Sequence, residues 1–200
     1  MYKGVYTAFV AVLIPVYWMH HGPENFLWFS DIALFATLIA VWIENRLLVS
    51  MMAVGVLLPE IAWCAGFFVQ LLGSGGWFLG AVEYMFDPRL PAWLRALSLF
   101  HLGLPPLLIV LVRRWGYDRR ALVAQTLLAW AVMLLAYFLT HPSGNVNWVH
   151  GWGYRATDTP KGLPHLACVM IGLPVLIFLP THGILIFFFG RSRAHAGQPA

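Results

Sequence analysis

Charged side chains are scarce in this chain. Lys, Arg, Asp and Glu together make up 10% of its 200 residues, whereas the apolar residue types make up 60%. Soluble domains carry about a quarter charged residues, so this composition excludes an ordinary soluble fold and a disordered chain. The basic pI of about 9.3 does not indicate nucleic-acid binding, because the basic residues lie in short segments between apolar runs, where they report membrane topology. We therefore expect an integral membrane protein with no nucleic-acid partner.

Cysteine is equally rare. Cys64 and Cys168 are the two in the chain, and both lie inside apolar runs with no zinc-binding or redox spacing. The cysteines therefore give no reason to expect a metal site, and the leading interpretation of the sequence includes no metal or other cofactor. It also contains no N-x-S/T sequon. Together with the short loops, this fits a multi-pass protein of a bacterial inner membrane.

Six apolar segments are long enough to cross a bilayer, which takes roughly 20 residues of helix. They are residues 4–19, 25–43, 47–72, 96–112, 121–140 and 164–189. We predict an all-α, polytopic bundle of about six transmembrane helices that forms a single domain over residues 1–190, with a disordered tail at 191–200. The run 75–86 is too short to span, and we expect it to lie at the membrane interface or to re-enter the membrane.

The distribution of basic residues predicts the orientation of this bundle. One side holds Lys3, Arg46, Arg113, Arg114, Arg119, Arg120, Arg191 and Arg193, and the other holds Arg89, Arg95, Arg155 and Lys161. Eight basic residues against four favour a cytoplasmic location for both termini. The loops rich in His, Asn and carboxylates then lie on the outer face, where we expect the chemistry.

Asp31, Glu60 and His101 fall inside predicted spans, where ionisable groups normally face the bundle interior and have a partner. Asp31 and His101 each lie about 9 Å below the outer end of their spans, so they are expected to pair. Glu60 lies near the midplane and is expected to be protonated, or bonded to His101 or an asparagine. We predict these three as catalytic residues. The competing interpretations are polar contacts between helices and, for Glu60, a bond to the backbone freed by Pro59.

The outer loops carry the predicted substrate-binding residues. Pro23 can open the second helix, which would place Glu24 and Asp31 on one helical face as an acidic stripe. The loop 141–152 holds more asparagine, histidine and tryptophan than a tight turn needs, although capping is an ordinary task of asparagine. The set is His21, Glu24, Asn25, Glu83, Asp87, His141, Asn145, Asn147 and His150.

Short motifs in the chain resemble those of the YwaF-like multi-pass membrane proteins. They are Ser30-Asp-Ile-Ala-Leu34 in the second span, His101-Leu-Gly in the fourth, similar to the family's His-Gly, and Asn147-Trp148 after the fifth. The resemblance covers most of residues 25–182. That family is similar to eukaryotic transmembrane acyltransferases of phospholipid metabolism, and it has been grouped with proteins proposed to act on lipid head groups.

The resemblance implies a polar centre of Asp31, His101 and Asn147. The family's histidine shortly before the span-two aspartate is replaced here by Leu27-Trp28-Phe29, and no cysteine occupies a convincing nucleophile position. Direct transfer assisted by a histidine base is therefore expected in preference to thiol-based acyl transfer.

The leading hypothesis is an integral membrane enzyme that acts on a lipid or lipid-linked substrate by acyl or head-group transfer at the outer face. His101 would be the general base, oriented by Asp31, with Asn25 and Asn147 holding the head group or an oxyanion. Membrane lipid is the expected partner, and self-association into a homo-oligomer is left open.

Two other classes compete with this hypothesis. A metal- or haem-binding protein is suggested by the eight histidines and by the His21/Glu24 spacing. A small transporter or a structural subunit is suggested by the midplane Glu60, but the chain lacks the internal repeat of many transporters.

Overall fold

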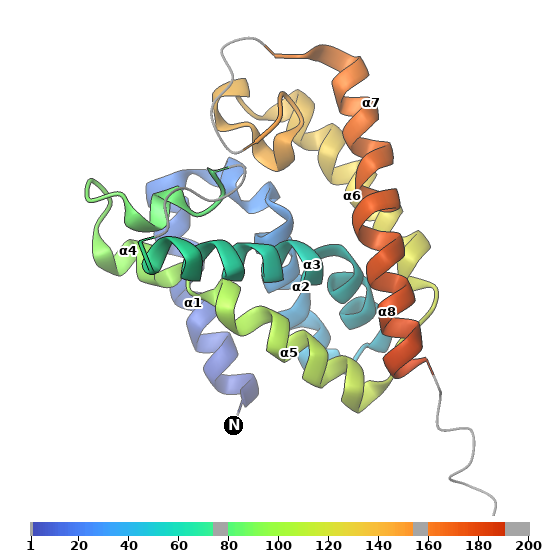
Figure 1. Cartoon of the computed structure of the whole chain (residues 1–200). Helices are drawn as coiled ribbons and strands as arrows, with labels where there is room; N and C mark the ends of the chain where they lie inside the picture. The colour runs from blue at the N-terminus through green and yellow to red at the C-terminus, as the bar shows by residue number, and fades with distance from the viewer. Residues whose placement is uncertain (1, 74–79, 154–159, 191–200) are drawn as a thin grey trace, which may run out of the picture.

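The computed structural model describes residues 2–73, 80–153 and 160–190. Within these ranges the regular elements are helical and no strand occurs (Figure 1). The elements are α1 (Tyr2–His21), η1 (Pro23–Leu27), α2 (Phe29–Ile43), α3 (Arg46–Leu71), η3 (Glu83–Phe86), α4 (Ala92–Leu97), α5 (Phe100–Trp115), α6 (Ala121–Leu139), η4 (Pro142–Gly144), η5 (Val146–Trp148), α7 (Gly162–Leu173), η6 (Pro174–Phe178) and α8 (Leu179–Phe189). The all-helical prediction is confirmed for this part of the chain.

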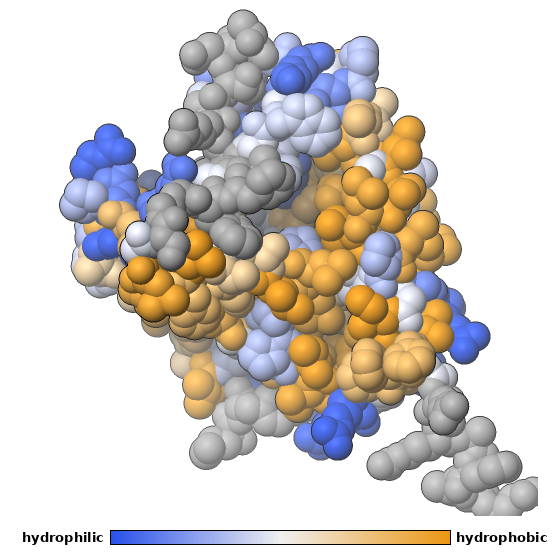
Figure 2. All heavy atoms as spheres, in the orientation of Figure 1, coloured by the Kyte–Doolittle hydropathy of each residue, from blue (hydrophilic) through white to orange (hydrophobic). Residues whose placement is uncertain are grey.

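Four helical stretches are long and apolar enough to cross a membrane. They are Arg46–Leu71, Ala92–Trp115, Ala121–Leu139 and Gly162–Phe189. Figure 2 shows a broad hydrophobic surface over the middle of the molecule, with hydrophilic residues at its ends. These features are those of a membrane protein, as the composition predicted. The count of six spans and the cytoplasmic location of the termini stay predictions.

The two N-terminal helices are not among these four stretches. α1 is 20 residues long, but its last turns carry tyrosine, tryptophan and two histidines, which lower its hydropathy. α2 has 15 residues and begins at Phe29, not at Asn25 as predicted. The residues before it form the separate 3₁₀ helix η1, and Trp28 between them is extended, with φ −61° and ψ 137°.

Two of the predicted spans are interrupted. In the fourth, a turn at Ser98 and Leu99 separates α4 from α5, so His101 is the second residue of a helix and not a mid-helix residue. In the sixth, the π-helix η6 joins α7 to α8. π-Helical turns widen a helix locally and often mark functional positions. The predicted interfacial run 75–86 lies partly outside the described residues, and its described part ends in η3.

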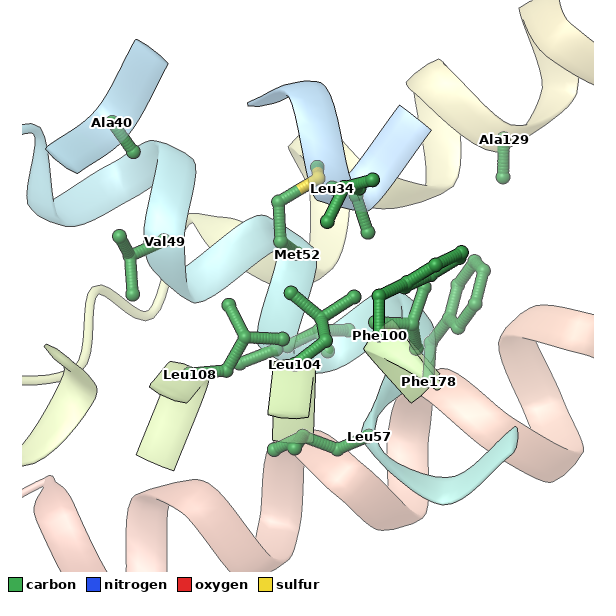
Figure 3. Packing of buried hydrophobic residues seen from close by; sticks show 14 of the residues in the cluster. Leu34, Ala40, Val49, Met52, Leu57, Phe100, Leu104, Leu108, Ala129 and Phe178 are labelled. Atoms are coloured by element: carbon green, nitrogen blue, oxygen red, sulfur yellow. The ribbon is translucent and has the colours of Figure 1, made fainter. Parts of the chain in front are cut away.

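The core forms around α3, which packs against α2, α5, α6 and α8. Because lipid tails are as apolar as leucine, close packing between helices holds such a bundle together. Figure 3 shows side chains of this core from α2, α3, α5, α6 and η6, among them Leu34, Ala40, Val49, Met52, Leu57, Phe100, Leu104, Leu108, Ala129 and Phe178.

The contact between α3 and α6 depends on a small residue. Gly55 lies on α3, and a Cβ atom there would be 2.7 Å from Cδ of the buried Gln125 on α6. Any larger residue would force this side chain aside, which is the reason for glycine at a close helix crossing.

Candidate functional site

A short contact between a buried carboxylate and a histidine joins α3 to α5 inside the bundle. Glu60 Oε2 lies 2.6 Å from His101 Nδ1. The Glu60 side chain is 4% exposed and that of His101 12%. A bond between Glu60 and His101 is one of the alternatives expected from the sequence, and the structure contains it.

Aromatic rings and a thiol surround this pair. Trp63 stacks on the His101 imidazole with ring centroids 4.3 Å apart, and Phe100 stacks on it at 4.2 Å. The thiol of Cys64 donates a hydrogen bond to the His101 carbonyl, with Sγ and O 3.3 Å apart. The sequence analysis did not place these three residues at the site. Helical spacing could have indicated two of them, since Trp63 and Cys64 follow Glu60 by three and four residues and so share its face. Phe100 directly precedes His101 in the sequence.

The expected pair of Asp31 and His101 does not form. Asp31 Oδ2 instead accepts a hydrogen bond from Asn25 Nδ2 at 3.3 Å. Asp31 is 4% exposed, and its Oδ1 has no partner among the described residues. Asp31 is therefore paired with Asn25, and His101 with Glu60.

The predicted acidic stripe of Glu24 and Asp31 is also absent. It required one continuous helix, and Trp28 interrupts the helix between them. Glu24 instead accepts a hydrogen bond from the backbone N–H of His141, with N and Oε2 3.2 Å apart. The His141 imidazole bonds to the Ser143 hydroxyl at 2.7 Å. Both residues therefore link η1 to the start of the loop 141–153.

Asn145 organises that loop. Asn145 is fully buried. Its side-chain Nδ2 donates to the carbonyls of Gly151 and Gly153, and its Oδ1 accepts from the His150 N–H. The backbone is left-handed there, with φ 40°, a conformation that asparagine tolerates better than most residues. The side chain predicted to bind substrate thus holds the loop's own backbone.

Asn147 connects the loop to the first turn of α2. Its Oδ1 accepts from the Phe29 N–H at 3.1 Å and its Nδ2 donates to the Leu27 carbonyl at 2.7 Å. The first N–H groups of a helix have no partner inside it, and here a residue far along the chain supplies one. This long-range cap from the same chain positions the helix that carries Asp31. Both amide atoms of Asn147 are engaged by backbone.

His150 is buried in the same loop without a hydrogen-bond partner for its ring. It stacks on Tyr137 of α6 with centroids 4.9 Å apart, and no described residue bonds to either ring nitrogen. Burial, with smaller contributions from His165 and His141, lowers the pKa of His150 below 6.5. The folded loop therefore favours the neutral imidazole.

We expect this histidine to make the protein less stable in acid. As the pH falls below 6.5, the unfolded chain binds a proton that the folded His150 does not, so stability decreases until the pH reaches the lower folded pKa. His150→Phe, which keeps a ring against Tyr137, should lose this part of the pH dependence. Thermal unfolding in detergent between about pH 8 and about pH 5 measures it, with the exposed His20→Phe as control. Equal pH profiles for all three proteins would contradict the assignment.

Three predicted binding residues remain, namely His21, Asp87 and Glu83. His21, at the end of α1, is exposed and its ring contacts Tyr17. Asp87 forms hydrogen bonds with the Arg89 guanidinium, which lower the pKa of its carboxyl to about 2. Glu83 lies half-buried in η3. None of these contacts, in the described residues, joins the site.

An apolar cleft of about 320 Å³ lies between α1, α2, α4 and α5, and neither Glu60 nor His101 is among its lining residues. The Tyr6 hydroxyl lies in it but donates to the Leu34 carbonyl at 2.7 Å. Phe100 both lines the cleft and stacks on His101. The lining residues are Tyr6, Phe9, Leu34, Ala96, Leu99, Phe100, Gly103, Leu104 and Leu107.

Among the described residues, no group of three or more His, Cys, Asp or Glu side chains is placed to hold a metal ion. No protein-family model, curated protein or solved structure matches the chain. The site therefore has to be interpreted from its own geometry.

Proposed function

We propose that this protein is an integral membrane enzyme that transfers an acyl or head group of a lipid or lipid-linked substrate at the outer face, with His101 as general base. The observation that carries the proposal is the 2.6 Å contact between Glu60 Oε2 and His101 Nδ1 inside the bundle. A carboxylate bonded to one ring nitrogen fixes the imidazole tautomer and leaves the other nitrogen free to accept a proton. No described residue bonds to His101 Nε2.

For acyl transfer, the proposed step needs no group beyond the substrates. His101 Nε2 takes the proton of an acceptor hydroxyl, from water or a lipid alcohol, as the hydroxyl oxygen bonds to the acyl carbonyl carbon. The bond from that carbon to the leaving oxygen then breaks, and the imidazolium returns the proton to the leaving oxygen. Glu60 stabilises the imidazolium between these events. This assigns to Glu60 the role that the sequence analysis gave to Asp31.

The apolar cleft supports a lipid as substrate. Its lining offers almost no hydrogen-bonding group, which suits an acyl chain, and one lining residue, Phe100, stacks on His101. An acyl chain held there would bring its ester group towards the imidazole. The YwaF-like resemblance leads to the same substrate class.

The test is lipid mass spectrometry of membranes that contain wild type, His101→Ala, His20→Ala or no protein. We expect at least one lipid species to change with wild type and with His20→Ala, and to revert with His101→Ala. His20 is the matched control because its exposed ring bonds only to the Val16 carbonyl of its own helix. Identical profiles in all four membranes, with the protein folded and abundant, would refute the enzyme proposal.

A further inference from the structure

Five exposed arginines gather where three packed helices end. Arg46 begins α3, Arg113 and Arg114 lie in the last turn of α5, and Arg119 and Arg120 directly precede α6. α3 packs against both α5 and α6, so these helix ends lie together. All three belong to stretches able to cross a membrane, which places the arginines at a membrane boundary, at the opposite end of α5 from His101.

The loop that carries two of these arginines is fixed to its neighbours. The N–H of the buried Asp118 donates to Ser50 Oγ on α3 at 3.0 Å. The hydroxyl of the buried Tyr117 lies 2.5 Å from His182 Nδ1 on α8. Loop 116–120 is therefore a preformed support rather than a loose connection.

The carboxylates at this end are already engaged. Asp118 accepts hydrogen bonds from Arg120, which lower the pKa of its carboxyl, and it forms an ion pair with Arg46 at 3.8 Å. Glu44 pairs with Lys3 at 2.9 Å. Arg113, Arg114 and Arg119 form no ion pair with any described residue.

We propose that this arginine cluster binds the phosphate of an anionic glycerophospholipid head group. A guanidinium matches phosphate oxygens with two parallel hydrogen bonds, and clusters of basic residues at the ends of membrane helices attract anionic lipids. The positive-inside rule accounts for positive charge in these loops. Beyond that rule, the fixed loop holds Arg119 beside Arg113 and Arg114, and none of the three forms an ion pair with a described residue that would compete with a phosphate. The site lies apart from Glu60 and His101 and does not depend on the proposed enzyme activity.

Native mass spectrometry of the full-length protein in detergent tests this site. Phosphatidylglycerol, phosphatidylcholine and free glycerol phosphate would be titrated separately. We expect phosphatidylglycerol to bind with the highest affinity and to raise the melting temperature. Arg114→Gln with Arg119→Gln should bind it on the order of 20-fold more weakly, since each basic residue near an anionic lipid surface contributes about fivefold.

Arg89→Gln with Lys161→Gln removes the same charge at the other end of the bundle and is the matched control. Its affinity for phosphatidylglycerol should equal that of wild type. Equal binding of phosphatidylcholine, an effect of glycerol phosphate as large as that of the lipid, or equal losses in the two double variants would each overturn the proposal.

Discussion

Replacing Glu60 with glutamine is expected to lower turnover of the lipid substrate by roughly 10²–10⁴-fold with little change in KM. Glutamine has nearly the same shape, but its amide nitrogen can donate to His101 Nδ1, which would move the imidazole proton to Nε2 and remove the base. Glu60 acts through His101 and is a positioning residue. The loss should therefore appear in kcat, because the substrate itself does not contact Glu60.

Initial rates would be measured in lipid nanodiscs. The substrate would be the lipid species that lipid mass spectrometry of the membranes identifies. The pH profile of kcat/KM reports which groups must be in the correct protonation state, so a changed profile in Glu60→Gln separates the catalytic role from a merely structural one. Glu24→Gln is the control, because this carboxylate bonds to the His141 backbone away from the pair. Activity of Glu60→Gln within a factor of about two of wild type, in a folded protein, would exclude the proposed role.

Replacing Asn147 with alanine is expected to destabilise the protein by about 2–4 kcal/mol. The change leaves two half-buried groups, the Phe29 N–H and the Leu27 carbonyl, without partners. A fully buried unsatisfied group costs about 1–3 kcal/mol, and partial exposure keeps the cost of each of the two at the lower end of that range. Hydrogen exchange at the Phe29 amide should accelerate at the same time, because the first turn of α2 loses its cap. Chemical unfolding in detergent measures the free energy.

Two further variants separate the lost bonds from backbone strain at Asn147, where φ is 51°. Asn147→Gly relieves any strain but removes the same bonds, so it should be nearly as unstable as Asn147→Ala. Asn45→Ala removes an exposed local cap whose Oδ1 accepts from the Leu48 N–H, and should cost only about 1 kcal/mol. A glycine variant as stable as wild type would show that the bonds of Asn147 contribute little.

The sequence predicted the features that depend on composition. A scarcity of charge and long apolar runs are sufficient to predict helices in a membrane, because lipid offers no partner for an unpaired backbone group. The interruptions could not be predicted in this way. α2 begins at Phe29 because Asn147, from a distant loop, bonds to its first turn, and no local signal reveals such a contact.

Only part of the site could be predicted from the sequence, because its contacts also depend on how distant elements pack. Counting residues from a helix end gives the depth of Asp31 and His101, but it gives neither the rotation of each helix nor its neighbour. The choice between Asp31 and Glu60 as the partner of His101 depends on rotation, and the packing of α3 against α5 decides it. The loop 141–153 was recognised as unusual, but whether an asparagine faces a ligand or a backbone carbonyl depends on loop conformation.

The long-range cap of α2 by Asn147 also affects the order in which the chain assembles. Phe29 and Asn147 are 118 residues apart, and at synthesis rates of about 5–20 residues per second Asn147 appears roughly 6–24 s after Phe29. During this interval the first turn of α2 cannot be completed, whatever the state of the helices already inserted. Asp31 therefore reaches its final position only after α6 and the loop behind it have been synthesised. The contact between Asn25 and Asp31 is then completed late in biogenesis.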